Sequence, residues 1–158
     1  MIVAMAENRY APRKMEFESL VRVLVEEHTT MREGLSRMRD AAARHDFRAV
    51  AAALKELDQI FRQHIADEES QILRLLIGEL GVKGAEEEVR VFQQHRPIYQ
   101  LMQAVAALAS KSAEELEVEQ TKLNALFLEH AAAEEERVFP RAMECYKGQP
   151  DRRALQER

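Results

Sequence analysis

Histidine and glutamate side chains recur in this sequence at a spacing that could bind metal ions. Two segments contain the pattern His-x-x-x-Glu: HIADEESQIL at residues 64–73 and HAAAEEERVF at residues 130–139. On an α-helix, residues four positions apart face the same side, so each segment presents an imidazole and a carboxylate together. The separation between two further histidines, His28 and His95, is almost the same as that between His64 and His130. The candidate metal ligands are His28, His64, Glu68, His95, His130 and Glu134.

Sequence breakers divide the chain into four predicted helices that would carry these residues. Asp46 and Ser112 are typical N-caps, and Glu115 completes a capping-box pattern with Ser112. GVKG at residues 81–84 separates the two helices between these caps. The predicted helices cover about residues 14–44, 46–80, 85–110 and 112–146.

Each predicted helix has a stripe of apolar residues at three-and-four spacing, and the six candidate ligands fall within these stripes. The stripes extend to Leu75 in the second helix and include Tyr99 and Ala106 in the third. Four amphipathic helices with short connections predict an all-α protein, an antiparallel up-down four-helix bundle. We expect a loose N-terminal tail at residues 1–13, the bundle at 14–147 and a charged C-terminal tail at 148–158.

The four histidines are predicted to lie at one level of the bundle. In an antiparallel hairpin, two residues are at the same level when they are equally far from the turn. The midpoints between successive histidines fall at residue 46, between 79 and 80, and between 112 and 113. The first and third midpoints lie at the predicted caps and the second lies inside the break between Gly78 and Gly84, so one histidine from each helix should point into one layer.

A buried layer of this composition favours metal binding over a purely structural role. Burying two carboxylates without compensation costs several kcal/mol each, which a bundle of ordinary stability could hardly tolerate. Four imidazoles and two carboxylates exceed the four ligands of a tetrahedral zinc site. Two ions that share the carboxylates fit better, and mixed nitrogen and oxygen ligation favours non-haem iron, with manganese second.

The pattern of the six residues, followed by EERVFP at residues 135–140, resembles the hemerythrin-like HHE cation-binding domains. The resemblance covers about residues 15–146. It implies an oxo- or hydroxo-bridged di-iron centre in which Glu68 and Glu134 bridge the ions. By the same pattern, His28 and His64 would bind one iron, and His95 and His130 the other. Manganese or zinc could substitute for iron.

Residues near the predicted ligands suggest how the site would be shaped. Oxygen-carrying hemerythrins have a further histidine where this chain has Tyr99, which could be a metal ligand, a hydrogen-bond donor to a bound ligand, or a core residue. Four apolar residues each lie three positions before a candidate histidine. We expect them to form one apolar layer beside the site that shapes a pocket for a small ligand. They are Val25, Phe61, Phe92 and Phe127.

The composition narrows the class of function. A net charge of −5 without a basic cluster argues against nucleic-acid binding, and the longest apolar stretch is too short to span a membrane. We therefore expect a cytoplasmic protein. The main hypothesis is a di-iron protein that binds or reacts with oxygen, nitric oxide or peroxide in a redox or stress response. The alternative is an iron-sensing, storage or regulatory module without catalysis. The sequence leaves open the physiological ligand, any enzymatic activity, the catalytic residues, the protein partner and the oligomeric state.

Overall fold

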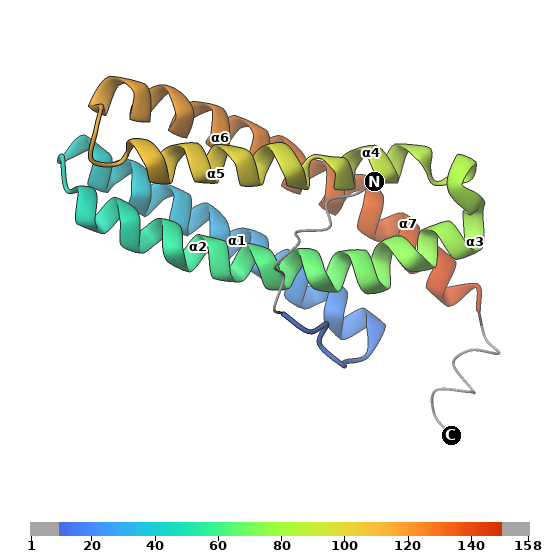
Figure 1. The fold of residues 1–158 in the computed structure, drawn as a ribbon. Helices are drawn as coiled ribbons and strands as arrows, with labels where there is room; N and C mark the ends of the chain where they lie inside the picture. Colours follow the sequence, from blue (N-terminus) through green and yellow to red (C-terminus); the bar gives the residue numbers. More distant parts are fainter. Residues whose placement is uncertain (1–9, 150–158) are drawn as a thin grey trace.

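A computed structural model describes residues 10–149 of the chain, and the described part is helical without strands. Its helical segments form the four rods of a bundle (Figure 1). The first rod is α1, and the other three are each divided into shorter segments. The segments are α1 (Phe17–Ala43), α2 (Phe47–Asp67), η1 (Glu68–Leu73), α3 (Arg74–Gly84), α4 (Glu86–Gln93), α5 (His95–Leu108), α6 (Ala113–Ala133), η2 (Glu134–Val138) and α7 (Phe139–Lys147).

The connections between the rods lie where the sequence predicted them. Asp46 caps α2 by accepting a hydrogen bond from the backbone of Ala49 at 3.1 Å. Ser112 caps α6 in the same way through the backbone of Glu115, at 3.3 Å. Gly81 has a φ of 73°, a left-handed conformation that glycine adopts without a Cβ penalty, and it forms the corner between the second and third rods. The α1–α2 and α5–α6 turns lie at one end of the bundle, and this corner lies at the other (Figure 1).

Two apolar clusters make up the core, and the polar layer separates them. The first cluster lies toward the α1–α2 and α5–α6 turns, and the second toward α3, α4 and α7. The first contains Met31, Leu35, Met38, Ala41, Val50, Ala53, Leu54, Leu57, Phe61, Ile65, Ile98, Met102, Val105, Ala109, Leu116, Leu123, Phe127 and Ala131. The second contains Leu20, Leu24, Ile72, Leu73, Leu76, Ala85, Val91, Phe92, Ala133, Val138, Phe139 and Ala142.

The second and fourth rods each change from α- to π-helix at a candidate ligand, η1 at Glu68 and η2 at Glu134. A π turn contains an extra residue, so the side chains that follow it are displaced around the helix. The predicted stripe at Leu75 is therefore wrong: the structure buries Leu76 completely and leaves Leu75 half-buried. Regular α-helical spacing could not have revealed this shift.

The third rod also differs from its predicted stripe. A break at Gln94 divides it into α4 and α5, three residues before Pro97, which has no backbone N–H for a helical hydrogen bond. Beyond the break the structure buries Ile98 and Val105, where the sequence predicted Tyr99 and Ala106. Tyr99 is half-buried and Ala106 is exposed.

The ends of the bundle differ in part from the predicted boundaries. Residues 1–9 of the predicted N-terminal tail and 150–158 of the C-terminal tail lie outside the described residues. The rest of the N-terminal tail is not loose, because the carbonyl oxygen of Ala11 and both the backbone and the guanidinium of Arg13 form hydrogen bonds with residues of α2. Apolar periodicity could not predict this contact, which depends on single polar pairs.

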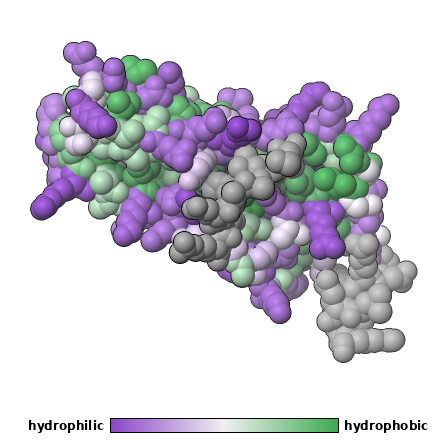
Figure 2. All heavy atoms as spheres, in the orientation of Figure 1, coloured by the Kyte–Doolittle hydropathy of each residue, from purple (hydrophilic) through white to green (hydrophobic). Residues whose placement is uncertain are grey.

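On the face shown in Figure 2, hydrophilic side chains cover most of the outline, and hydrophobic residues gather along the middle of the bundle and near the end formed by α3 and α4. Within residues 10–149, no helix is both long enough and apolar enough to cross a membrane.

The Asp46 cap gives a test of this helix assignment. Replacing Asp46 with alanine removes the acceptor for the Ala49 amide and should lower the free energy of unfolding by about 1 kcal/mol. Metal content should not change, because His64 lies about 27 Å further along the helix. Urea unfolding measures the effect, with Asp46→Asn as the control that keeps a capping oxygen. An alanine variant as stable as the parent would contradict the assigned cap.

Candidate metal centre

The six predicted ligands meet in one buried layer between the two apolar clusters. Each side chain is at most 1% exposed. They form two overlapping groups in which the donor atoms lie within 4.8 Å of one another. Both groups contain Glu68 and Glu134. One adds His28 and His64, and the other adds His95 and His130.

The histidines form two pairs across the layer. The ring centroids of His28 and His64 are 4.8 Å apart, and those of His95 and His130 are 4.9 Å apart. This is the pairing that the family resemblance implied. The two carboxylates lie between the pairs: Glu134 is 3.3 Å from His28 Nε2 and 2.6 Å from His130 Nε2, while Glu68 contacts His64 Nε2 and lies 3.6 Å from His95 Nε2.

The atoms that face the centre of the layer are not satisfied by hydrogen bonds. All four Nε2 atoms and all four oxygens of the two carboxylates are buried and have no hydrogen-bond partner. The contacts between these nitrogens and oxygens are short but do not have the geometry of hydrogen bonds. Buried polar groups without partners are strongly unfavourable, and a bound cation would satisfy imidazole nitrogens and carboxylate oxygens at once. The donor set therefore fits metal ions.

The outward nitrogens of the histidines face a second set of polar residues. Nδ1 of His64 lies 3.2 Å from a carboxylate oxygen of Glu27, and Nδ1 of His28 lies 3.3 Å from one of Glu135. Nδ1 of His130 lies 3.0 Å from the amide oxygen of Gln94. These acceptors require a proton on Nδ1, which leaves the Nε2 lone pair directed into the layer.

Nδ1 of the remaining histidine, His95, faces a carboxylate oxygen of Glu69 at 3.6 Å, which is not a hydrogen bond. None of these outer residues was predicted from the sequence. Each of them directly precedes or follows a candidate ligand in the sequence, which is the only signal that could have indicated them. They are Glu27, Glu69, Gln94 and Glu135.

Comparison with known families identifies the domain. The family model described as hemerythrin HHE cation binding domain matches residues 4–76 and 19–142. The second match covers most of the chain and includes all six candidate ligands. The chain belongs to the hemerythrin HHE cation-binding family. Comparisons with curated proteins and with solved structures gave no match.

The aromatic neighbours of the HHE site lie on both sides of it, not in the single layer that the sequence analysis expected. Phe61 and Phe127 belong to the first apolar cluster. Phe92 is part of the second, and the half-buried Val25 packs against it. The prediction was wrong because neighbouring rods are antiparallel. A residue three positions before its histidine therefore lies on one side of the layer in two of the rods and on the opposite side in the other two.

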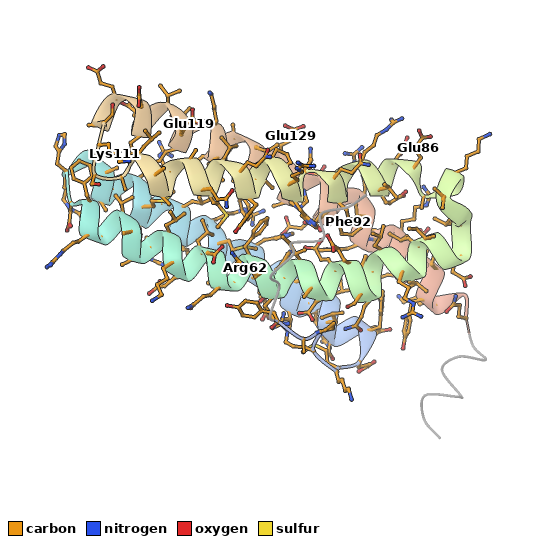
Figure 3. The ribbon with its side chains drawn as sticks, in the orientation of Figure 1. Arg62, Glu86, Phe92, Lys111, Glu119 and Glu129 are labelled. Atoms are coloured by element: carbon orange, nitrogen blue, oxygen red, sulfur yellow. The ribbon has the colours of Figure 1, made fainter. Side chains whose placement is uncertain are left out.

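These aromatic rings pack directly on the histidines. The ring of His95 lies between Phe61, at a centroid distance of 6.0 Å, and Phe92, at 5.5 Å. Figure 3 shows Phe92 pointing from α4 into the bundle, whereas Glu86 on the same helix points outward. His28 lies 6.2 Å from Phe127 and stacks at 5.8 Å on Phe139, which the sequence analysis did not select. The rings exclude water from both sides of the layer.

Tyr99, which the sequence left with several interpretations, has a hydrogen-bond partner in the protein. Its hydroxyl accepts a hydrogen bond of 2.7 Å from the guanidinium of Arg62, which also lies 5.2 Å from the centre of the tyrosine ring. Asp58 holds the same guanidinium through two contacts of 3.0 and 3.1 Å. Binding of metal by Tyr99 would require its hydroxyl to leave Arg62.

The charges in the layer shift the pKa values of its members when no cation is bound. Burial lowers the pKa of His95, but Glu68, Glu69 and Glu134 outweigh burial and raise it to about 9. The pKa of His64 is likewise raised well above 6.5, against the effect of burial, chiefly by the charge of Glu68. Burial alone would raise the pKa of Glu134, yet its neighbours, His130 first, hold it well below 4.5. Protons on His64 and His95 therefore compensate the buried carboxylates in the metal-free protein.

This compensation predicts a pH dependence of metal stabilisation. A histidine with a raised pKa stabilises the metal-free fold fully below its unfolded pKa of about 6.5, and this contribution is lost as the pH rises through about 9. A cation competes with these protons, so it should bind more tightly as the pH rises. Urea unfolding with excess zinc, compared with EDTA, should show a larger stabilisation by zinc at pH 8.5 than at pH 6.5. Equal stabilisation at both values would show that zinc and protons do not compete.

The role of Tyr99 can be tested by removing its hydroxyl. Tyr99→Phe eliminates the hydrogen bond to Arg62 and should lower the free energy of unfolding by roughly 1 kcal/mol. We expect the iron content and the visible spectrum of the loaded protein to remain as in the parent. Loss of a visible absorption band in the variant, with iron retained, would instead identify the phenol as a metal ligand.

Proposed function

We propose that the six buried residues bind two iron ions, with Glu68 and Glu134 shared between them. His28 and His64 would complete one position, and His95 and His130 the other. The supporting observation is the pair of overlapping donor groups that have both carboxylates in common. One ion could not use all eight inward atoms that lack hydrogen-bond partners, whereas two ions that share the carboxylates can.

The chemistry of the donors supports iron. Neutral imidazoles and carboxylates bind several divalent metals, and this mixture with open positions is typical of non-haem iron. A purely structural zinc site usually has four ligands in a closed tetrahedron, which six shared donors do not resemble. Manganese or zinc could occupy the same donors when iron is scarce.

We propose further that the centre binds or reacts with a small ligand, namely oxygen, nitric oxide or peroxide, in a redox or stress response. Each position has two histidines and two shared carboxylates, which leaves room for an external ligand. Bound iron would supply the redox chemistry. The protein itself holds three of the four imidazoles by their outer nitrogens and packs phenylalanine rings against the layer, which favours small uncharged ligands.

A regulatory module that senses or stores iron is the second candidate function. The observation that favours it is the hydrogen-bonded path from the site to the segment before α1, through Glu27 and Arg13. Metal occupancy could then be transmitted to the outside of the domain. The two functions share the same metal ligands and differ in whether an external ligand reacts.

Metal content tests the first part of the proposal. Protein from iron-replete cells should contain two iron ions per chain, and Glu68→Ala should lower this content because it removes a shared ligand. Binding to the native state adds about 2.7 kcal/mol of stability at a hundredfold excess over Kd, so chelation should lower Tm. His45→Ala is the matched control, because His45 is exposed at the α1–α2 turn. One zinc per chain that persists in iron-supplemented cells would contradict the proposal.

The ligand reaction needs a separate experiment. Visible spectra of the reduced, iron-loaded protein should change when oxygen, nitric oxide or peroxide is added. The parent and His45→Ala should respond alike, and His95→Ala should not give the parent's response. A loaded protein whose spectrum is unchanged by all three ligands would favour the sensing or storage function.

A further inference from the structure

The two halves of the metal layer differ in what lies behind their histidines. We call His28 and His64 the first pair, and His95 and His130 the second pair. The two hairpins that carry them repeat weakly in sequence, because His95 follows His28 by 67 residues and His130 follows His64 by 66. At these offsets Gln94 occupies the position of Glu27, and Ala133 occupies the position of Asp67. The second pair therefore lacks two carboxylates that the first pair has nearby.

A short segment before α1 contacts both of these carboxylates. We call residues 10–16 the N-terminal strap; in Figure 1 it is the dark blue stretch beside α2. The guanidinium of Arg13 donates to Glu27 at 2.9 Å and, through Nε, to Asp67 at 2.7 Å. The backbone N–H of Arg13 also donates to Asp67, at 2.7 Å. Asp67 is completely buried, so the strap supplies the charge that compensates it.

Two glutamines fix the strap further. The side-chain amide of Gln71 donates to the carbonyl oxygen of Arg13 at 2.9 Å, and that of Gln63 donates to the carbonyl oxygen of Ala11 at 3.0 Å. The strap is therefore held by its backbone as well as by one side chain. It connects Glu27 on α1 with Asp67 on α2, and these are the two helices that carry the first pair of histidines.

The contacts continue from the strap to the metal layer. The oxygen of Glu27 that accepts from Arg13 also lies 3.2 Å from Nδ1 of His64. A carboxylate that accepts from Nδ1–H orients an imidazole and strengthens Nε2 as a metal ligand. The other histidine of the first pair, His28, faces Glu135. This carboxylate accepts a hydrogen bond of 3.1 Å from Arg32 through its second oxygen. Both outer carboxylates of this pair are thus fixed by an arginine.

The second pair has weaker outer contacts. His130 faces the neutral amide oxygen of Gln94 at 3.0 Å. Nδ1 of His95 and the facing oxygen of Glu69 are 3.6 Å apart, and both lack a hydrogen-bond partner. These imidazoles are therefore oriented less strongly than those of the first pair.

We infer that the N-terminal strap makes the two cation positions unequal. The position at His28 and His64 holds its cation more tightly and releases it more slowly than the position at His95 and His130. Arg13 is a positioning residue that acts through Glu27 and Asp67. The inference rests on the proposed function, because it requires two bound cations.

The coupling between docking of the N-terminal strap and binding of the cation must act in both directions. If docking of the strap strengthens cation binding, then cation binding must strengthen docking of the strap by the same factor. The Arg13 amide reports on docking, because its hydrogen bond to Asp67 exists only when the strap is in place. Hydrogen exchange at this amide should slow when zinc binds, and zinc keeps the sample diamagnetic for NMR.

Release of zinc to a chromophoric chelator measures the inequality directly. The parent, loaded with two zinc ions, should release them in two phases whose rates differ by about tenfold, the size of effect that loss of an outer hydrogen-bond partner has on metal affinity. Glu27→Gln places a neutral amide behind His64, like the amide of Gln94 behind His130. It should accelerate the slow phase only. Gln94→Glu makes the opposite exchange and should slow the fast phase.

Two further variants separate the strap from a general loss of charge or stability. Arg13→Gln combined with Asp67→Asn removes both members of the buried pair, so Asp67 is not left as a buried charge without its arginine, while Glu27 keeps its contact with His64. It should accelerate the slow phase and abolish the zinc-dependent protection near residue 13. Arg90→Gln removes an exposed arginine that pairs with Glu86 on α4, and it should change neither phase.

The outcomes distinguish this inference from the proposed function. Fewer than two iron ions in the iron-loaded parent, together with fewer than two zinc ions in the zinc-loaded parent, would overturn the proposed function and the inference together. Two ions released in a single phase would overturn the inference alone. Equal acceleration of both phases by Glu27→Gln would also overturn it, because that result would indicate a general loosening of the bundle.

Discussion

Two carboxylates buried inside an apolar bundle are the constraint on which the rest of this structure depends. Glu68 and Glu134 are fully buried, and none of their oxygens has a hydrogen-bond partner. Burial of an uncompensated charge is strongly unfavourable, so the surroundings must supply positive charge. Four imidazoles face the carboxylates, and two apolar clusters close the layer on both sides. Protons can compensate the charges in the metal-free protein, whereas cations can use all the inward donor atoms at once.

The fold brings six residues from distant parts of the chain to one level by simple means. Turns equally far from the histidines set the level, and helical spacing places each glutamate one turn after its histidine. The π-helical segments begin at the two glutamates, so the rods depart from regular α geometry at the site itself. Such segments are frequent at functional sites. Outside the layer, Glu27, Gln94 and Glu135 orient the histidines and thereby determine which nitrogen faces inward.

The sequence was sufficient to predict the bundle, its turns and the meeting of the six candidate ligands, because these features depend on periodicity and on caps such as Asp46 and Ser112. It was not sufficient where geometry departs from a regular α-helix. The π turn at Glu68 moved burial from Leu75 to Leu76, and antiparallel packing placed Phe61 and Phe92 on opposite sides of the layer. The outer contacts depend on single side chains that have no periodic pattern. The hydrogen bonds from Arg13 to the buried Asp67 also depend on single side chains. The prediction of a loose tail was therefore wrong for this segment.

Two cations that share both carboxylates would occupy two separate places in the layer. Anomalous scattering at the iron absorption edge, measured on crystals of the iron-loaded protein, locates each ion. We expect two peaks in the layer, one beside His28 and His64 and one beside His95 and His130, each within bonding distance of Glu68 and Glu134. A single peak, or peaks away from the two glutamates, would contradict this arrangement.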